Sequence, residues 1–193
     1  MVRELNIALV GCGNWGKNIA RNLHQMGYLA CIYDSKSILS EELSYNYMLP
    51  TFELDKIFEN QNINAIVIAS PAITHKDLAI EALKNDKDVF IEKPFCLSLP
   101  DAQKLSELAT NKNRVLMVGH LLNYHNAFIK MKELIKNGKI GVPQNIRANR
   151  LALGAIRSDE SVIYDLSVHD ISMILSITEE LPFNVNVQSI HHQ

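Results

Sequence analysis

Short apolar runs alternate with stretches of helical periodicity over the first 120 residues. Each run is rich in aliphatic and β-branched side chains, which is typical of strands buried on both faces. The strands predicted in this way cover 5–10, 29–33, 65–70, 88–91 and 115–119. Between them, apolar residues recur at three and four positions, which predicts helices. Strands that alternate with helices predict an α/β fold with a doubly wound parallel sheet.

Local signals place some of the helix boundaries. A moderate helical pattern covers 37–48, and 49–52 is expected to be a short strand or a loop. Thr74, with Asp77 three residues later, resembles a capping box and predicts a helix that begins there and ends near Asn85. Ser98 and Pro100 are expected to open the next helix.

The pattern changes beyond residue 120. A helix is predicted over about 126–137, an extended segment over 142–153 and an alternating strand over 183–190. The segment 162–177 is apolar on nearly every side, so we expect a buried helix there.

We predict two domains, 1–122 and 123–193. Two strands can form only a very small sheet with exposed edges. The second domain is therefore expected to be an incomplete α+β unit with an open sheet, truncated at Gln193.

Composition narrows the class of protein. The chain is 47% hydrophobic with a net charge of −2, and it has no basic block for a nucleic-acid backbone. No signal peptide or membrane-spanning run is recognisable, so a cytoplasmic protein without membrane contact is expected. Cys12, Cys31 and Cys96 form no C-x-x-C pair and are interpreted as reduced thiols. No metal-ligand spacing is present, so no metal site is predicted.

A glycine-rich turn follows the first predicted strand and precedes a helical pattern. Gly11, Gly13 and Gly16 have the G-x-G-x-x-G spacing, with Asn14 and Trp15 between them. In this context the turn favours binding of a dinucleotide, whose pyrophosphate would lie at the helix N-terminus.

Asp34 ends the second predicted strand, where an acid can accept hydrogen bonds from ribose hydroxyls. Its charge favours NAD over NADP, although Ser35 and Lys36 keep NADP possible. The alternative is a tight turn that binds no cofactor, with Asp34 as a helix cap.

The ends of the third and fourth strands carry further candidates. Ser70 and Pro71 follow one strand, and Glu92 and Lys93 follow the other. Lys93 could hydrogen-bond a substrate hydroxyl, and a cis bond to Pro94 would fix the lysine. The alternative is a surface Glu–Lys pair. His75 lies near the expected cofactor and could equally be a helix cap.

The predicted helix 162–177 carries one polar stripe. Asp165, His169, Ser172 and Ser176 share a face at helical spacing. Asp165 could orient His169, which makes His169 a candidate general base. The alternative is a core histidine bonded to a helical neighbour.

Other candidates lie outside these motifs. His120 could line the substrate cleft or belong to a hinge. Arg147, Arg150 and Arg157 could hold a substrate diphosphate, or form a solvated strand edge.

Four stretches resemble the family of glucose–fructose oxidoreductase, inositol dehydrogenase and MocA: GCGNWGKN at 11–18, ASPAITH at 69–75, VFIEKP at 89–94 and DLSVHDIS at 165–172. The resemblance implies an NAD(P)-binding Rossmann domain followed by an α/β domain with a large open sheet. It also implies catalytic roles for Lys93, Asp165 and His169, and contact of Glu92 with the nicotinamide ribose.

GHLLNYHNAF at 119–128 and LALGAIRSDESVIYDLSVHDIS at 151–172 resemble the branch that oxidises the 3-hydroxyl of UDP-N-acetyl amino sugars. That implies a nucleotide-sugar substrate, a role in surface polysaccharide or lipid A biosynthesis, and a homo-oligomer for a full-length chain. Family members continue well past residue 193, so a fragment or a shortened gene is expected. The alternatives are a non-catalytic dinucleotide-binding module or inactive fragment, and a dehydrogenase of another sugar or inositol.

Overall fold

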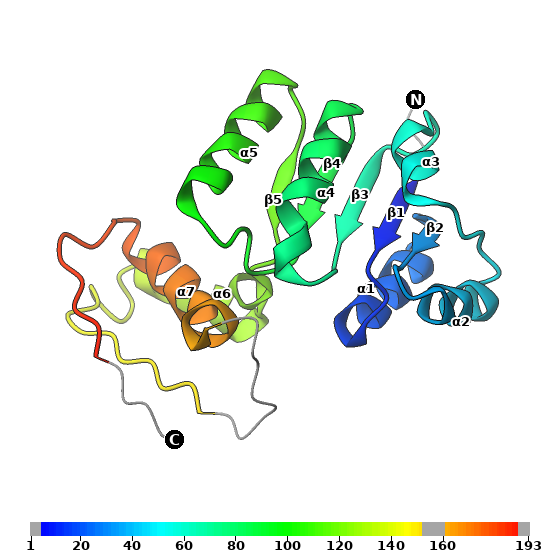
Figure 1. Cartoon of the computed structure of the whole chain (residues 1–193). Helices are drawn as coiled ribbons and strands as arrows, with labels where there is room; N and C mark the ends of the chain where they lie inside the picture. The colour runs from blue at the N-terminus through cyan, green and yellow to red at the C-terminus, as the bar shows by residue number, and fades with distance from the viewer. Residues whose placement is uncertain (1–4, 152–160, 189–193) are drawn as a thin grey trace, which may run out of the picture. The chain divides into compact units, whose positions relative to one another are not determined.

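The computed structural model describes residues 5–151 and 161–188, and the chain divides into two compact units, Met1–Gly119 and His120–Gln193. The first unit contains a five-stranded sheet in the order β2-β1-β3-β4-β5, in which every pair of neighbours is parallel (Figure 1). The strands are β1 (Ile7–Val10), β2 (Leu29–Tyr33), β3 (Ala65–Ile68), β4 (Asp88–Ile91) and β5 (Leu116–Val118). The predicted doubly wound α/β fold is confirmed.

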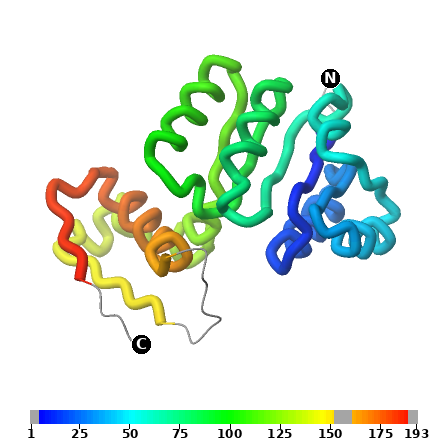
Figure 2. The backbone as a smooth tube through the Cα atoms, in the orientation of Figure 1, coloured from blue at the N-terminus to red at the C-terminus, as the bar shows by residue number. Residues whose placement is uncertain are grey.

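Alternate residues of the central strand β1 point to two separate apolar cores. Ala8 and Val10 belong to the core packed by α3, α4 and α5, whereas Ile7 and Leu9 belong to the core packed by α1 and α2. The helices of this unit are α1 (Asn14–Gln25), α2 (Ser37–Tyr47), α3 (Leu54–Glu59), α4 (Ala72–Lys84) and α5 (Leu99–Asn111), and the chain between them can be followed in Figure 2. Both faces of the sheet are covered, as the continuous apolar strands predict.

The predicted capping box at Thr74 is wrong. Helix α4 begins two residues earlier, with Pro71 as its N-cap residue. Thr74 therefore lies within the first turn, where its hydroxyl donates a hydrogen bond of 2.7 Å to the Pro71 carbonyl. The expected start of α5 is confirmed, because the Ser98 side chain accepts the Asp101 N–H at 3.3 Å.

All the regular elements in the described part of the second unit are helical. It contains the 3₁₀ turn η1 (Leu121–Tyr124), α6 (Asn126–Lys136), the π-helical turn η2 (Ile163–Ser167) and α7 (Val168–Thr178). The predicted strand 183–190 is wrong over 183–188, and 142–151 pairs with no strand. An alternating pattern becomes a strand only beside a partner edge, and the described part of this unit offers none.

The predicted helix 162–177 is present but divided between η2 and α7. None of its residues is buried, and Ile171 is 47% exposed, so the expected burial is wrong for this chain. A helix that is apolar on every side is buried only where other elements surround it. Across the residues that the structure describes, each helix is too short or too polar to cross a membrane.

Candidate functional site

The sheet has a topological switch point beside β1, which pairs with β2 on one side and β3 on the other. Ligands of such folds bind outside the carboxyl ends of the strands at this point. Gly11 follows β1 there with a φ of +101°, and a Cβ on it would lie 2.5 Å from the carbonyl carbon of Ala69. A Cβ on Gly16 would collide with the Gly11 carbonyl. The turn and the helix can therefore pack this closely only because both positions are glycine.

Gly13 leaves the space that a pyrophosphate needs. It is the N-cap residue of α1, and a Cβ built on it would meet nothing within 4 Å. The first N–H groups of a helix have no partner within the helix, and they carry its positive dipole end. At α1 these groups include those of Asn14 and Trp15. The residues present therefore fit the phosphates of a dinucleotide.

Asp34 links the end of β2 to the glycine turn. Its Oδ2 accepts the Cys12 N–H at 2.6 Å and its Oδ1 accepts the Lys36 N–H at 2.8 Å. Helix α2 begins only at Ser37 and has no side-chain cap, so Asp34 is not the helix cap that the alternative required. Each carboxylate oxygen has a second lone pair, which leaves Asp34 able to accept ribose hydroxyls.

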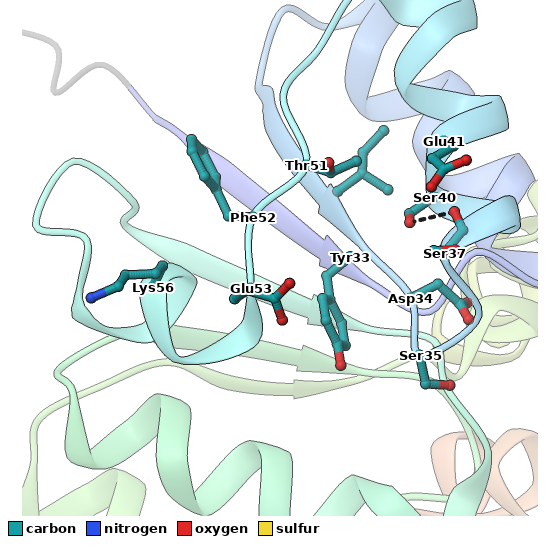
Figure 3. Close-up of a pocket in the computed structure, with 11 residues that line it drawn as sticks. Tyr33, Asp34, Ser35, Ser37, Ser40, Glu41, Thr51, Phe52, Glu53 and Lys56 are labelled. Atoms are coloured by element: carbon teal, nitrogen blue, oxygen red, sulfur yellow. Dashed lines mark hydrogen bonds between the residues drawn. The ribbon is translucent and has the colours of Figure 1, made fainter.

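A pocket of about 520 Å³ adjoins Asp34 (Figure 3). It lies between the end of β2, the start of α2 and the segment 51–56. Two further carboxylates, Glu41 and Glu53, line it with Asp34, against the single cation Lys56. The pocket is therefore acidic, which disfavours an additional phosphate at this end of the cofactor.

Glu92 is a buried carboxylate at the end of β4, with 8% of its surface exposed. Burial raises its pKa, while a hydrogen bond from the Trp15 side chain, the Lys93 N–H and the charges of Lys93 and His75 oppose that rise. Glu92 thus contacts a residue of the glycine turn. The half-buried Lys93 follows it, and the Lys93–Pro94 bond is cis, as the sequence suggested.

His75 lies in the interior rather than at the surface of the site. Its ring is 1% exposed, and its two nitrogens lie 2.8 Å from the carbonyl oxygens of Pro94 and Ser70. The ring neither caps α4 nor offers a nitrogen to a cofactor. The Ser70 hydroxyl is bonded to the Thr74 hydroxyl at 2.7 Å.

The second unit carries the remaining candidates. Asp165 lies in the π-helical turn η2 and His169 in α7, both half-buried, and the Ser172 hydroxyl donates to the His169 carbonyl at 2.8 Å. The two residues thus lie in successive helical elements, and the orientation of His169 by Asp165 stays a prediction. His120 has a buried Nδ1 without a hydrogen-bond partner, and burial lowers its pKa.

Of the three arginines predicted to hold a diphosphate, Arg150 is bonded to another residue of the protein. Its Nε and Nη2 donate to the two carboxylate oxygens of Asp170 at 2.9 and 2.7 Å. This fork is the group that was expected to bind a diphosphate, and in the structure it is bonded to a carboxylate, so that role of Arg150 stays a prediction. Arg147 is exposed and lines a pocket of about 340 Å³, and Arg157 lies outside the described residues. Asp170 was missed, although it stands next to His169 in the quoted motif.

Cys12, Cys31 and Cys96 are free thiols, as their spacing suggested. Burial raises the pKa of both Cys12 and Cys31 to about 12, so the thiolate that acts as nucleophile is scarce. Cys12 therefore contributes its backbone N–H to the glycine turn rather than a reactive sulfur.

The switch point, the glycine turn and the acid at the end of β2 define a dinucleotide-binding domain of the Rossmann class. The model of the GFO_IDH_MocA family, described as an oxidoreductase family with an NAD-binding Rossmann fold, matches residues 5–120. The chain belongs to this family, and its first unit is an NAD-binding domain.

Similar proteins act on several sugar-like compounds. The chain is 27% identical to the UDP-N-acetylglucosamine 3-dehydrogenase of Acidithiobacillus ferrooxidans over 97% of its own length and 58% of that protein. It is 28% identical to the scyllo-inositol 2-dehydrogenase (NAD(+)) of Bacillus subtilis, covering 88% of the chain and 53% of the relative. It is 32% identical to the 2,7-anhydro-N-acetylneuraminate hydratase of Escherichia coli, covering 71% of the chain and 37% of the relative.

A crystal structure of the Acidithiobacillus ferrooxidans dehydrogenase superimposes with a TM-score of 0.85 at 27% identity, over 97% of this chain and 61% of that one. A structure of GenD2 from gentamicin A biosynthesis, in complex with NAD, has a TM-score of 0.80 at 21% identity. The match covers 92% of this chain and 54% of that one. At that identity the second likeness concerns the fold alone. The chain spans about half the length of the curated relatives that it matches.

Proposed function

We propose that the chain belongs to an NAD-dependent dehydrogenase that oxidises a sugar hydroxyl, the 3-hydroxyl of a UDP-N-acetyl amino sugar. The observation that carries the proposal is the pair Glu92 and Lys93 at the end of β4. A buried carboxylate that contacts the glycine turn, followed by a half-buried lysine, suits a reaction beside the cofactor better than it suits a solvated surface pair.

The cofactor would run along the ends of the strands. Asp34 would accept the adenosine ribose hydroxyls, and the start of α1 would hold the pyrophosphate. Ser70, Pro71 and Glu92 would then surround the nicotinamide end. When bound, NAD supplies the hydride acceptor, which is the difficult part of the chemistry.

The protein would supply the proton transfer. His169, with Asp165, would take the proton of the substrate hydroxyl, and Lys93 would donate a hydrogen bond to the same oxygen. Lys93 lies in the first unit and the other two residues lie in the second. The UDP-N-acetylglucosamine 3-dehydrogenase of Acidithiobacillus ferrooxidans aligns with 97% of the chain, which supports this assignment.

The substrate candidates differ in whether they carry a nucleotide. With Arg150 bonded to Asp170, Arg147 and Arg157 remain as candidates for a UDP diphosphate. The similarity to scyllo-inositol 2-dehydrogenase favours a second candidate, an inositol or a sugar without a nucleotide. A dinucleotide-binding module without catalysis is the third candidate, since the glycine turn and Asp34 both lie within the first unit.

Turnover separates these candidates. Reduction of NAD⁺ should be measured with UDP-N-acetylglucosamine and with myo-inositol, for the chain and for its whole open reading frame where that is longer. In an active protein, His169→Asn should lower the rate by roughly 10²–10⁴-fold while NAD binding persists. Lys93→Met should also slow the reaction, and His24→Asn, on the exposed side of α1, serves as the control.

Each outcome identifies one candidate. Turnover of the inositol alone would replace the nucleotide sugar, and NAD binding without turnover of either compound would favour the binding module. An unchanged rate in His169→Asn would remove this residue from the mechanism.

A further inference from the structure

His75 is a buried histidine whose two nitrogens both face backbone carbonyls. It is the fourth residue of α4, and its ring is 1% exposed. Nδ1 lies 2.8 Å from the oxygen of Pro94, and Nε2 lies 2.8 Å from the oxygen of Ser70. These carbonyls belong to the segments that follow β4 and β3.

The two contacts restrict the state of the ring. A carbonyl oxygen only accepts hydrogen bonds, and a neutral imidazole has only one N–H to donate. In a neutral ring, one contact would place two lone pairs against each other in the interior, which is costly. Both contacts are hydrogen bonds only when both ring nitrogens carry protons.

A buried cation requires a nearby anion, and Glu92 provides one. Glu92 is 8% exposed at the end of β4. Burial raises the pKa of this carboxyl, and the charge of His75 is among the influences that lower it again. Lys93 is the other charged group that acts on Glu92.

We infer that His75 carries both ring protons and acts as a positioning residue, tying the segment after β3 to the segment after β4. Ser70 adjoins Pro71, and Pro94 adjoins Lys93, so one ring sets the separation of the two segments proposed to surround the nicotinamide. The inference rests on the cofactor orientation proposed above. His75 itself then touches neither the cofactor nor the substrate.

The test compares two ligands that share the adenosine end. ADP would occupy only Asp34 and the glycine turn, whereas NAD also reaches the segments joined by His75. In calorimetric titrations, His75→Gln should weaken NAD binding by about tenfold, the scale of one or two orienting hydrogen bonds. ADP affinity should change by less than about twofold. His24→Gln, a histidine on the exposed side of α1, should change neither.

A purely structural role would weaken both ligands equally, and that result would overturn the positioning role. If the unmutated protein binds ADP but not NAD, the proposed cofactor orientation fails instead, so the two failures are distinguishable.

The ring state can be read in the unmutated protein, which keeps the inference testable if His75→Gln does not fold. Nitrogen NMR of isotope-labelled protein distinguishes a ring with two protonated nitrogens from one with a protonated and a bare nitrogen. We expect two equivalent protonated nitrogens for His75. A bare nitrogen would contradict the inference.

Discussion

At the scale of single residues, one carboxylate connects two parts of the cofactor site. Asp34 accepts an N–H of the glycine turn with one oxygen and the Lys36 N–H with the other. Its charge therefore lies at a fixed place near the adenosine end, with two more acids in the adjoining pocket. Discrimination between cofactors should depend on this charge, because the 2′-phosphate of NADP is negative.

Asp34→Asn keeps an oxygen for the Cys12 N–H and removes the charge. NAD⁺ should bind more tightly than NADP⁺ to the unmutated protein. In the variant, the ratio of the two affinities should fall by about tenfold. Glu107→Gln is the matched control, since Glu107 is exposed on α5 and does not line the pocket. Calorimetry that gives equal affinities for the two cofactors in the unmutated protein would contradict the role of Asp34.

The sequence identifies residues whose roles follow from local spacing. Gly11, Gly13 and Asp34 follow strand ends, so the fold alone brings them together. Pro94, one partner of His75, is 19 residues away, and the partner of Arg150 is 20 residues away. No spacing rule indicates such pairs. Burial decides between a surface and an interior histidine, and only the folded sheet determines burial.

At the scale of elements, prediction succeeded where one element alone settles the pattern. The strands 29–33 and 88–91 were predicted with their observed ends, because turn residues follow apolar runs that are covered on both faces. In contrast, the alternating segment 183–190 needs a partner strand, and the apolar helix 162–177 needs elements around it. Their predictions failed because tertiary surroundings, not local pattern, determine both.

The Arg150–Asp170 pair should stabilise the second unit by fastening an irregular segment to α7. The side chains are 31% and 21% exposed and are joined by two hydrogen bonds. Arg150→Met should lower the free energy of unfolding by about 1 kcal/mol. Lys130→Met is the control, because its pair with Glu133 on α6 is more exposed.

Acid should remove the effect of the Arg150–Asp170 pair. The hydrogen bond from Arg150 lowers the pKa of Asp170 from its usual value of 3.8. The pair therefore stabilises the unit fully above that value and loses its effect as the pH falls through the lowered folded pKa. Thermal melts should show a difference between Arg150→Met and the unmutated chain at pH 7 that shrinks in strong acid. A constant difference would contradict the ionic origin.

At the scale of the whole molecule, the two units differ in how completely each is built. Every residue of the two buried cores lies between Ile7 and Ala109, within the first unit. The glycine turn, Asp34 and Glu92 lie there too. The described part of the second unit has a single buried apolar residue, Phe128. Dinucleotide binding should therefore be a property of the first unit by itself, whatever the second requires.

A fragment of residues 1–122 should fold cooperatively and bind ADP within about twofold of the whole chain. The physical reason is that the sheet, both of its helical layers and the phosphate-facing end of α1 are all included. In the same fragment, Gly13→Asp is the variant that should lose ADP binding. A Cβ at Gly13 meets nothing, so the fragment should still fold, while the added carboxylate should repel the pyrophosphate. Circular dichroism melts and calorimetry measure the two properties separately. A fragment that unfolds without cooperativity, or Gly13→Asp with unchanged ADP affinity, would show that the site has been placed wrongly.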